Sequence, residues 1–122
     1  MTHHLGAEYL SERMRECIEN CSDCHDVCLE TVTYGLARGG DYADAAHVRA
    51  LLTCATTCDT SRDLMLLGSS LHHRMCGVCA DACAACAESC ERFGDDDQLR
   101  RCAEQCRRCE ESCRAMAAGH DG

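Results

Sequence analysis

The sequence has no proline, lysine or tryptophan, and it has few of the residues that usually build a hydrophobic core. Without proline, the residue that most often interrupts helices, the chain allows long unbroken helices. Leu, Ile, Val and Phe number eleven, one, four and one among 122 residues. Together with a net charge of −9, that short supply is typical of disordered chains. A packed core therefore needs another residue type.

The sequence also lacks features that several classes of protein need. It contains no stretch of about 18 apolar residues free of charge, so no membrane-spanning helix is expected. The first fifteen residues contain no apolar run of signal-peptide length. Acidic residues outnumber basic ones by 21 to 12, which argues against nucleic acid as a partner. We therefore expect a cytoplasmic protein with reduced thiols and with no membrane or nucleic-acid partner.

What the chain has in abundance is cysteine, with fifteen residues. A free thiol packs as a small hydrophobe and is among the most buried side chains, so cysteine supplies the missing core. Most of the cysteines are three or four positions apart, which places them on one face of a helix. This same-face spacing and the odd count argue against a disulfide framework. The fifteen are Cys17, Cys21, Cys24, Cys28, Cys54, Cys58, Cys76, Cys79, Cys83, Cys86, Cys90, Cys102, Cys106, Cys109 and Cys113.

Glycines divide the chain into four predicted helices. Each break fits a helix stop, and three are followed by residues suited to cap the next helix. The expected caps are Asp41, Ser69 or Ser70, and Asp95. The predicted helices span 7–38, 42–67, 71–93 and 96–118, and their short connections make neighbours antiparallel. We therefore predict a single domain over residues 1–122, an all-α, up-down-up-down four-helix bundle with a cysteine-lined core.

Four stripes of thiols that face one interior predict metal binding. Soft thiolates select copper(I), zinc or iron–sulfur clusters. Structural zinc takes four ligands, usually from short knuckles, and iron–sulfur clusters use loop spacings such as those that end in Cys-Pro. Copper(I) accepts two or three thiolates, and cysteines three or four apart on a helix, with Cβ atoms about 5–6 Å apart, suit one such ion. A single site would leave most thiols unused, so we predict many Cu(I) ions per chain.

Two other hypotheses stay open at this stage. One is a zinc or general soft-metal buffer of the metallothionein type, with about four thiols for each zinc. The other is an iron–sulfur electron carrier, which would show visible absorption and a reducible chromophore. The favoured hypothesis is a non-enzymatic protein that holds copper(I).

The two ends of the predicted bundle differ in their side chains. One end collects thioethers and imidazoles, which are weaker copper(I) ligands than thiolates and suit transient capture or auxiliary ligation. These are Met14, Met65, Met75, Met116, His72 and His73, with His120 nearby. The other end presents a predicted hydrophobic plug, with His47 at its rim as a further candidate ligand. The plug consists of Leu51, Phe93, Leu99 and Tyr34.

The cysteine stripes resemble those of the bacterial copper storage proteins, in particular the cytosolic branch. The resemblance covers residues 9–117 and rests on the stripe 17–28, on CGVCADACAACAESC at 76–90 and on CAEQCRRCEESC at 102–113. It implies a four-helix bundle that binds many copper(I) ions for sequestration and homeostasis, and it implies a homotetramer. It also implies histidine and methionine at the open end, which His72 and Met75 fit. A copper chaperone or recipient enzymes are the expected protein partners.

The second predicted helix departs from the pattern of the family. His47 occupies a position where several cytosolic relatives would have cysteine, and the helix keeps only Cys54 and Cys58. Ser61 interrupts the stripe and cannot replace a thiolate. We therefore expect a lower copper capacity than in the fullest members, and a different mode of binding near His47.

Overall fold

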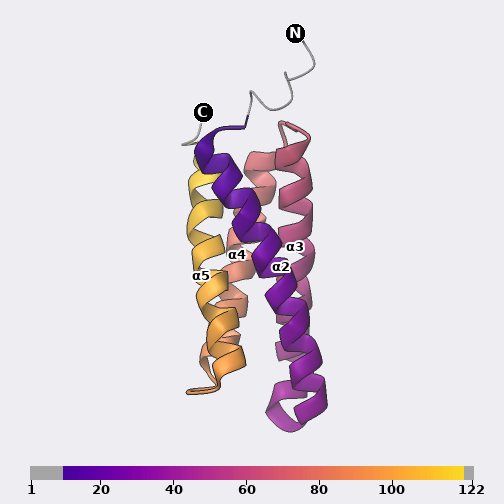
Figure 1. Cartoon of the computed structure of the whole chain (residues 1–122). Helices are drawn as coiled ribbons and strands as arrows, with labels where there is room; N and C mark the ends of the chain where they lie inside the picture. The colour runs from indigo at the N-terminus through magenta and orange to yellow at the C-terminus, as the bar shows by residue number, and fades with distance from the viewer. Residues whose placement is uncertain (1–9, 120–122) are drawn as a thin grey trace.

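The computed structural model describes residues 10–119, and every regular element in that range is helical. In chain order these are α2 (Glu12–Arg38), the short 3₁₀-helix η2 (Gly40–Ala43), α3 (Ala45–Leu66), α4 (His72–Glu91) and α5 (Asp97–Ala117). Figure 1 shows the four long helices as an antiparallel bundle, so the predicted all-α four-helix fold is confirmed. None of these helices is long and apolar enough to cross a membrane.

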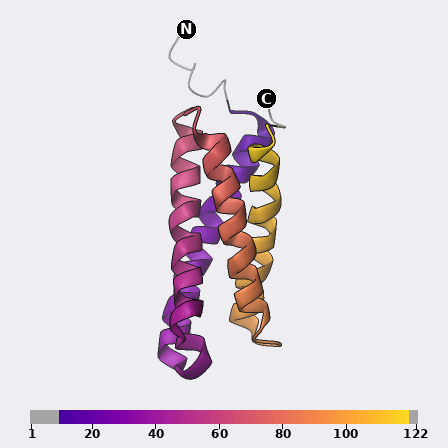
Figure 2. The ribbon, with the colours of Figure 1, turned by 180° about the vertical axis from the view of Figure 1, so that it is seen from behind.

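Helices α2 and α4 lie diagonally opposite each other. Each packs against both α3 and α5, and α2 crosses the front of the bundle in Figure 1 while α4 crosses the front in the reverse view of Figure 2. The starts of α2 and α4 meet the ends of α3 and α5 at the Met/His end, which is marked by Met14, Met65, His72 and Met116. The opposite end holds the α2–α3 and α4–α5 connections. We call it the aromatic end, after Tyr34, Tyr42 and Phe93.

The first two long helices begin later than predicted. Ser11 accepts a hydrogen bond from a backbone N–H of the first turn, so α2 starts after the predicted residue 7. The expected cap at Asp41 is wrong, because the chain first forms η2 and Asp44 then caps α3. Gly35 makes room for η2, since a Cβ there would collide with the carbonyl oxygen of Tyr42.

The caps of the last two helices also differ from the expected residues. Asp96, not Asp95, caps α5 by accepting a hydrogen bond of 3.1 Å from the N–H of Leu99. Neither predicted serine caps α4. Leu71 holds the cap position, while the Ser69 hydroxyl accepts from the Leu71 N–H inside the preceding turn. Several neighbouring polar residues are able to cap a helix, and the path of the connecting turn selects among them.

Sulfur makes up most of the core. All fifteen cysteines are buried, and so are three of the methionines within residues 10–119. Of the leucines in that range, only Leu51 and Leu99 are buried. Cysteine therefore takes the place that leucine holds in an ordinary bundle, as its small, apolar thiol allows. The predicted cysteine-lined core is confirmed.

The aromatic end is held together by the carboxylate of Asp96. Tyr34 Oη donates to Asp96 Oδ2 at 2.7 Å and Tyr42 Oη donates to it at 3.1 Å. The Arg38 guanidinium lies 5.0 and 4.8 Å from the centroids of these two tyrosine rings, and Tyr42 packs on Phe93 at 4.6 Å. The predicted hydrophobic plug is thus only part of this end, because one carboxylate also ties α2 and η2 to the start of α5.

Asp96→Ala should lower the free energy of unfolding by about 2 kcal/mol, because it removes a helix cap and two tyrosine hydrogen bonds. Chemical denaturation of the metal-free protein measures this. Asp95→Ala is the matched control, since Asp95 is exposed and its side chain does not cap the helix. We expect the control to stay within about 0.5 kcal/mol of the wild type. Equal losses in the two variants would contradict this account of the aromatic end.

The same carboxylate gives a pH signature. Desolvation by itself would raise the pKa of Asp96, but hydrogen bonds from Tyr34, the Leu99 N–H and Tyr42 outweigh it and hold the pKa below its ordinary value of 3.8. Stability from a carboxylate with a lowered folded-state pKa is present above the unfolded value and is lost as pH falls through the folded one. The stability difference between wild type and Asp96→Asn should therefore be constant near neutral pH and shrink below 3.8.

Candidate metal centre

The four cysteine stripes converge on one interior. All fifteen side chains are free, buried thiols. Neighbouring Sγ atoms are 3.6–4.0 Å apart, and most of these contacts join different helices. The sequence predicted the stripes, and the packing of the helices decides which thiols meet. We call the whole array of fifteen cysteines the thiol ladder.

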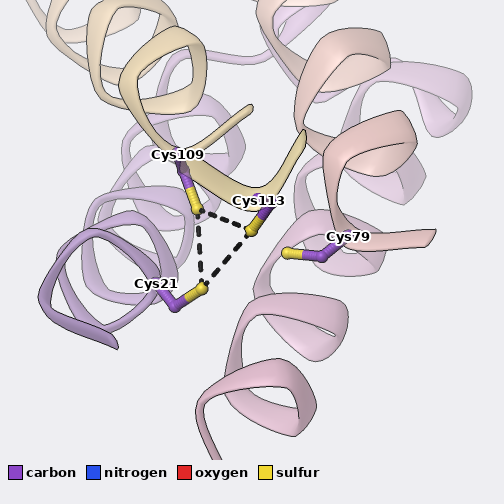
Figure 3. A group of neighbouring side chains, drawn as sticks. All are labelled: Cys21, Cys79, Cys109 and Cys113. Atoms are coloured by element: carbon purple, nitrogen blue, oxygen red, sulfur yellow. Dashed lines mark hydrogen bonds between the residues drawn. The ribbon is translucent and has the colours of Figure 1, made fainter. Parts of the chain in front are cut away.

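One group of thiols forms a nearly equilateral triangle, shown in Figure 3. The Sγ atoms of Cys21 and Cys109 are 3.7 Å apart, those of Cys21 and Cys113 are 3.8 Å apart, and those of Cys109 and Cys113 are 3.9 Å apart. The centre of such a triangle lies about 2.2 Å from each sulfur, close to the zinc–thiolate bond length of about 2.3 Å. A soft ion with three ligands therefore fits without a shift of the helices. Cys79 points toward this triangle from α4, with its Sγ within 4.8 Å of the other three.

Two further triangles repeat this geometry, and no cysteine belongs to more than one of the three. The second joins thiols of α3 and α4 at 3.6–3.9 Å, and the third joins one thiol each from α2, α3 and α5 at 3.6–4.0 Å. The second group is Cys58, Cys79 and Cys83, and the third is Cys24, Cys54 and Cys106. Nine of the fifteen thiols thus stand in three-ligand groups.

Short contacts connect the triangles. Cys58 lies 3.8 Å from Cys109 of the first triangle, and Cys83 lies 3.7 Å from Cys54 of the third. Four sets of four thiols, in each of which all Sγ atoms lie within 4.8 Å of one another, share members along the same path. An ion held at one level of the ladder therefore has a thiol of the next level close by.

Six thiols extend the ladder beyond the triangles. Cys17 lies 3.7 Å from Cys113 near the Met/His end. Toward the aromatic end, Cys28 lies 3.9 Å from both Cys86 and Cys102. The six are Cys17 and Cys76 on the Met/His side, and Cys28, Cys86, Cys90 and Cys102 on the other. All fifteen predicted ligands are thus brought into one array.

Burial opposes the charged form of every ladder thiol, while hydrogen bonds between neighbouring thiols raise the pKa of some cysteines and lower that of others. The neighbouring thiols of Cys102 and Cys106, together with burial, raise the pKa of Cys28. Cys113 and Cys17, together with burial, raise the pKa of Cys76 in the same way. No arginine within residues 10–119 is buried, and the sequence has no lysine to pair with a thiolate. Metal uptake must therefore release thiol protons.

The Met/His end gathers the soft side chains that the sequence analysis placed there. Met14, Met65 and Met116 are buried, and His72 is 7 % exposed. His72 stacks on His73 with ring centroids 3.9 Å apart. These side chains stand between the ladder and the solvent at this end of the bundle.

The remaining residues predicted at this end lie at its margin. His73 is half-buried, with Nδ1 2.8 Å from the carbonyl oxygen of Met116. Met75 is half-buried too, and its carbonyl accepts a hydrogen bond from Ser61. His120 lies outside the described residues. The thioethers of Met14, Met65 and Met116 are therefore more deeply buried at this end than the side chain of Met75.

His47 lies deeper than its predicted position at the rim. It is 1 % exposed, and its ring centroid lies 4.8 Å from that of Phe93. Its Nδ1 is 2.7 Å from Ser89 Oγ. Burial and the charge of Arg92 lower the pKa of His47, which favours the neutral imidazole. Because Ser89 engages Nδ1, Nε2 is the nitrogen left for a metal, as is common for metal-bound histidine.

Two serines beside the ladder, Ser89 and Ser112, make contacts that the sequence did not predict. Ser89 holds the ring of His47. Ser112 accepts a hydrogen bond from the Asn20 side chain of α2 and donates one to the Cys109 carbonyl, so it joins two helices behind the first triangle. Serines at such spacings are usual on exposed helix faces, and nothing in the sequence distinguishes these two. Only their packing shows what they contact.

The chain is similar to several copper storage proteins. It matches the copper storage protein family model over residues 10–118. A solved structure from Nitrosospira multiformis is 41% identical, with a TM-score of 0.82, and the match covers 88% of this chain and 96% of that one. The Cu(I)-bound copper storage protein 3 of Bacillus subtilis is 32% identical, with a TM-score of 0.81 and coverage of 87% and 99%.

A third similar structure is the copper storage protein of Streptomyces lividans loaded with 10 copper equivalents. It is 31% identical, with a TM-score of 0.81 and coverage of 88% of this chain and 86% of that one. No curated protein sequence matches the chain. The family match spans all fifteen cysteines and nearly the whole chain. The chain therefore belongs to the copper storage protein family.

Proposed function

We propose that the protein stores copper(I), and that it holds many ions on the thiol ladder inside the bundle so that little free copper remains. The observation that carries the proposal is the continuity of the ladder, in which three separate thiol triangles are joined by contacts of 3.7 and 3.8 Å. A catalytic or structural metal site uses three or four protein ligands, whereas fifteen thiols converge here. The copper-loaded relatives support the same assignment.

At the first and second triangles, coordination geometry favours copper(I) over zinc. A structural zinc site needs four ligands at tetrahedral positions, which in this interior would be thiolates. In the set that contains Cys21, Cys109 and Cys113, the fourth thiol is Cys79. The short contacts of Cys79 are instead with Cys58 and Cys83, at 3.6 and 3.9 Å. A zinc ion would therefore take its fourth ligand from the neighbouring triangle, while ions with two or three ligands can occupy both triangles at once.

The spacing of the thiols disfavours an iron–sulfur cluster. Such a cluster places iron and inorganic sulfide between its cysteine ligands, so the ligating sulfurs are held apart by the cluster itself. In this interior the sulfurs are already in contact at 3.6–4.0 Å. Inserting a cluster would require the helices to move apart. The role proposed here is accordingly non-enzymatic.

Anaerobic titration of the reduced protein with Cu(I) should saturate near one ion per cysteine, so at roughly fifteen ions per chain. The loaded protein should also melt at a much higher temperature than the metal-free protein, because the metal binds the folded state. Metal analysis after gel filtration and a thermal melt measure the two effects. Saturation at about four zinc ions with weak copper binding would favour the buffer hypothesis, and a visible, reducible chromophore would favour the electron carrier.

We infer that copper reaches the ladder at the Met/His end. The thioethers of Met14, Met65 and Met116 and the imidazole of His72 stand in front of Cys17, the first ladder thiol of α2. Thioether and imidazole bind copper(I) without losing a proton and more weakly than thiolate, which suits capture followed by transfer inward. His73 and Met75 assist at the margin. At the other end His47 serves as an auxiliary nitrogen ligand through Nε2.

Replacing Met14, Met65 and Met116 together with leucine should slow Cu(I) uptake about threefold or more and leave the capacity unchanged, because leucine fills similar space without a ligand atom. Stopped-flow transfer from a coloured Cu(I) chelator measures the rate. The control is Leu51→Met, which adds a thioether at the aromatic end and should leave the rate as it is. If the triple variant takes up copper at the wild-type rate, these methionines are not part of the uptake pathway.

We also propose a cytoplasmic location, since the similar Streptomyces lividans protein is described as cytosolic. A copper chaperone or a recipient enzyme is the protein partner that a store of this kind needs.

We further infer a homo-oligomer, with a tetramer as the expected form. Its support is a surface groove of about 570 Å³ beside the α2–α3 connection, whose lining includes Leu36 and Leu52, 59% and 44% exposed.

Light scattering should give about 53 kDa, four times the chain mass of 13.3 kDa. The double variant Leu36→Glu with Leu52→Glu should shift the mass toward the single chain, because charge in an apolar interface is costly. Leu67→Glu is the control, since Leu67 is 74% exposed at the Met/His end and should leave the mass unchanged. A wild-type mass of about 13 kDa at micromolar concentration would refute the oligomer.

A further inference from the structure

Cys90 is the thiol of the ladder that lies closest to the surface. The other fourteen cysteines are 0% exposed, whereas Cys90 is 2% exposed. It is the last cysteine of α4, at the aromatic end, and the thiols of Cys102 and Cys86 are its nearest partners in the ladder. Cys90 is therefore the member of the ladder that retains some contact with solvent.

A groove on the outer seam between α4 and α5 leads to this thiol. Its volume is about 400 Å³, which suits a small molecule. Cys90 lines it together with two small residues, Gly94 and Ala103, whose small size leaves space beside Cys90. Across the rest of the ladder the thiols face one another in the interior. At this position a cysteine of the ladder lines a surface groove.

The rim of this groove is cationic on an otherwise acidic protein. Three arginines and two glutamates line it, while the whole chain has a net charge of −9. Arg107 forms ion pairs with Glu91 of α4 at 2.9 Å and with Glu110 of its own helix at 3.0 Å. Arg100 pairs with Asp97, whereas the guanidinium of Arg108 hydrogen-bonds to the neutral amide of Gln105. The charged rim residues are Arg100, Arg107, Arg108, Glu91 and Glu104. A small anion is therefore favoured at the groove over the surrounding surface.

We propose that this α4–α5 groove is a second copper exchange point, at which a small anionic thiol docks and takes copper(I) from the ladder through Cys90. The inference rests on the proposed storage function and adds a ligand class and a route to it. The Met/His end offers thioethers and imidazoles in front of its thiols, which suits capture of incoming copper. The groove offers a ladder thiol directly, which suits removal by a competing thiol.

The exchange step is a ligand substitution without change of oxidation state. The sulfur of the incoming thiol forms a bond to a copper(I) ion held by Cys90, and the bond from that ion to the Cys90 sulfur breaks. The proton of the incoming thiol passes to the Cys90 thiolate as it is released. Each remaining ladder thiolate on that ion is displaced in the same way by a further thiol, which gives it a proton, so charge and protons balance when the ion leaves bound to the incoming thiols.

Site-resolved alkylation of the folded, metal-free protein tests access. Iodoacetate, an anionic probe, and iodoacetamide, its neutral counterpart, are applied in limiting amounts, and peptide mass spectrometry gives the rate at each cysteine. Cys90 should react at least tenfold faster than the other fourteen thiols. Its iodoacetate-to-iodoacetamide ratio should also exceed that of free cysteine. Equal rates along the ladder, or fastest reaction at Cys17 or Cys76, would overturn the proposal whether or not the protein binds copper.

Two pairs of variants separate the groove from general loosening of the fold. Ala103→Leu fills the groove beside Cys90 and should slow alkylation of this thiol tenfold. Ala115→Leu, the same change on the same helix near the Met/His end, should not. Arg108→Gln should lower the iodoacetate preference, whereas Arg101→Gln should keep it, since Arg108 lines the groove and Arg101 pairs with Glu30 outside it. If the members of either pair behave alike, the groove is not the route.

Copper removal tests the exchange itself. The loaded protein is mixed with excess mercaptosuccinate, a small dicarboxylate thiol, and the loss of bound copper is followed in time. Ala103→Leu should slow removal about fivefold or more without changing the amount of copper bound, and Ala115→Leu should match the wild type. Removal at the same rate in both variants would overturn the exchange role. A protein that binds no copper at all would instead refute storage, and the alkylation result would still stand on its own.

Discussion

The contact between buried thiols is the interaction on which the rest of this structure depends. A cysteine side chain is short, so Sγ atoms from different helices meet at 3.6–4.0 Å only where the helices hold them in register. That spacing decides what the interior is able to bind, because a triangle of such sulfurs has the size of one soft metal ion. It also limits the apo fold, since a thiol buries less apolar surface than leucine does.

The two ends of the bundle compensate for this weak core in different ways. At the aromatic end, Asp96 accepts hydrogen bonds from Tyr34 and Tyr42 and caps α5, which fixes the connections between helices. At the Met/His end, buried thioethers and the stacked pair His72 and His73 close the interior with groups that can also bind copper. Hydrogen bonds between elements are thus concentrated on Asp96 at one end and soft ligands at the other, with the thiol ladder between them.

Much of the fold and of the metal centre could be predicted from the sequence, because the cysteines keep helical spacing over the whole chain. The bundle, its antiparallel order and the buried stripes follow from that spacing and from the glycines between helices. The residues that cap the helices could not be predicted from this spacing. Asp44 and Asp96 cap the helices in place of Asp41 and Asp95, because η2 and the hydrogen bonds from Tyr34 and Tyr42 to Asp96 set the path of each turn. The contacts of Asp96 join residues far apart in sequence, and the close approach of Gly35 to Tyr42 depends on how the chain turns into η2, so neither leaves a recognisable local pattern.

The sequence by itself determined that the thiols line one interior, since steps of three and four leave a helix only one face for them. It also determined which soft side chains gather at each end, because short connections force antiparallel neighbours. The tertiary structure decided which thiols form triangles, that Ser89 holds His47, and that Cys90 lines a surface groove. These depend on the rotation and crossing of the helices, which packing sets and helical spacing alone does not encode.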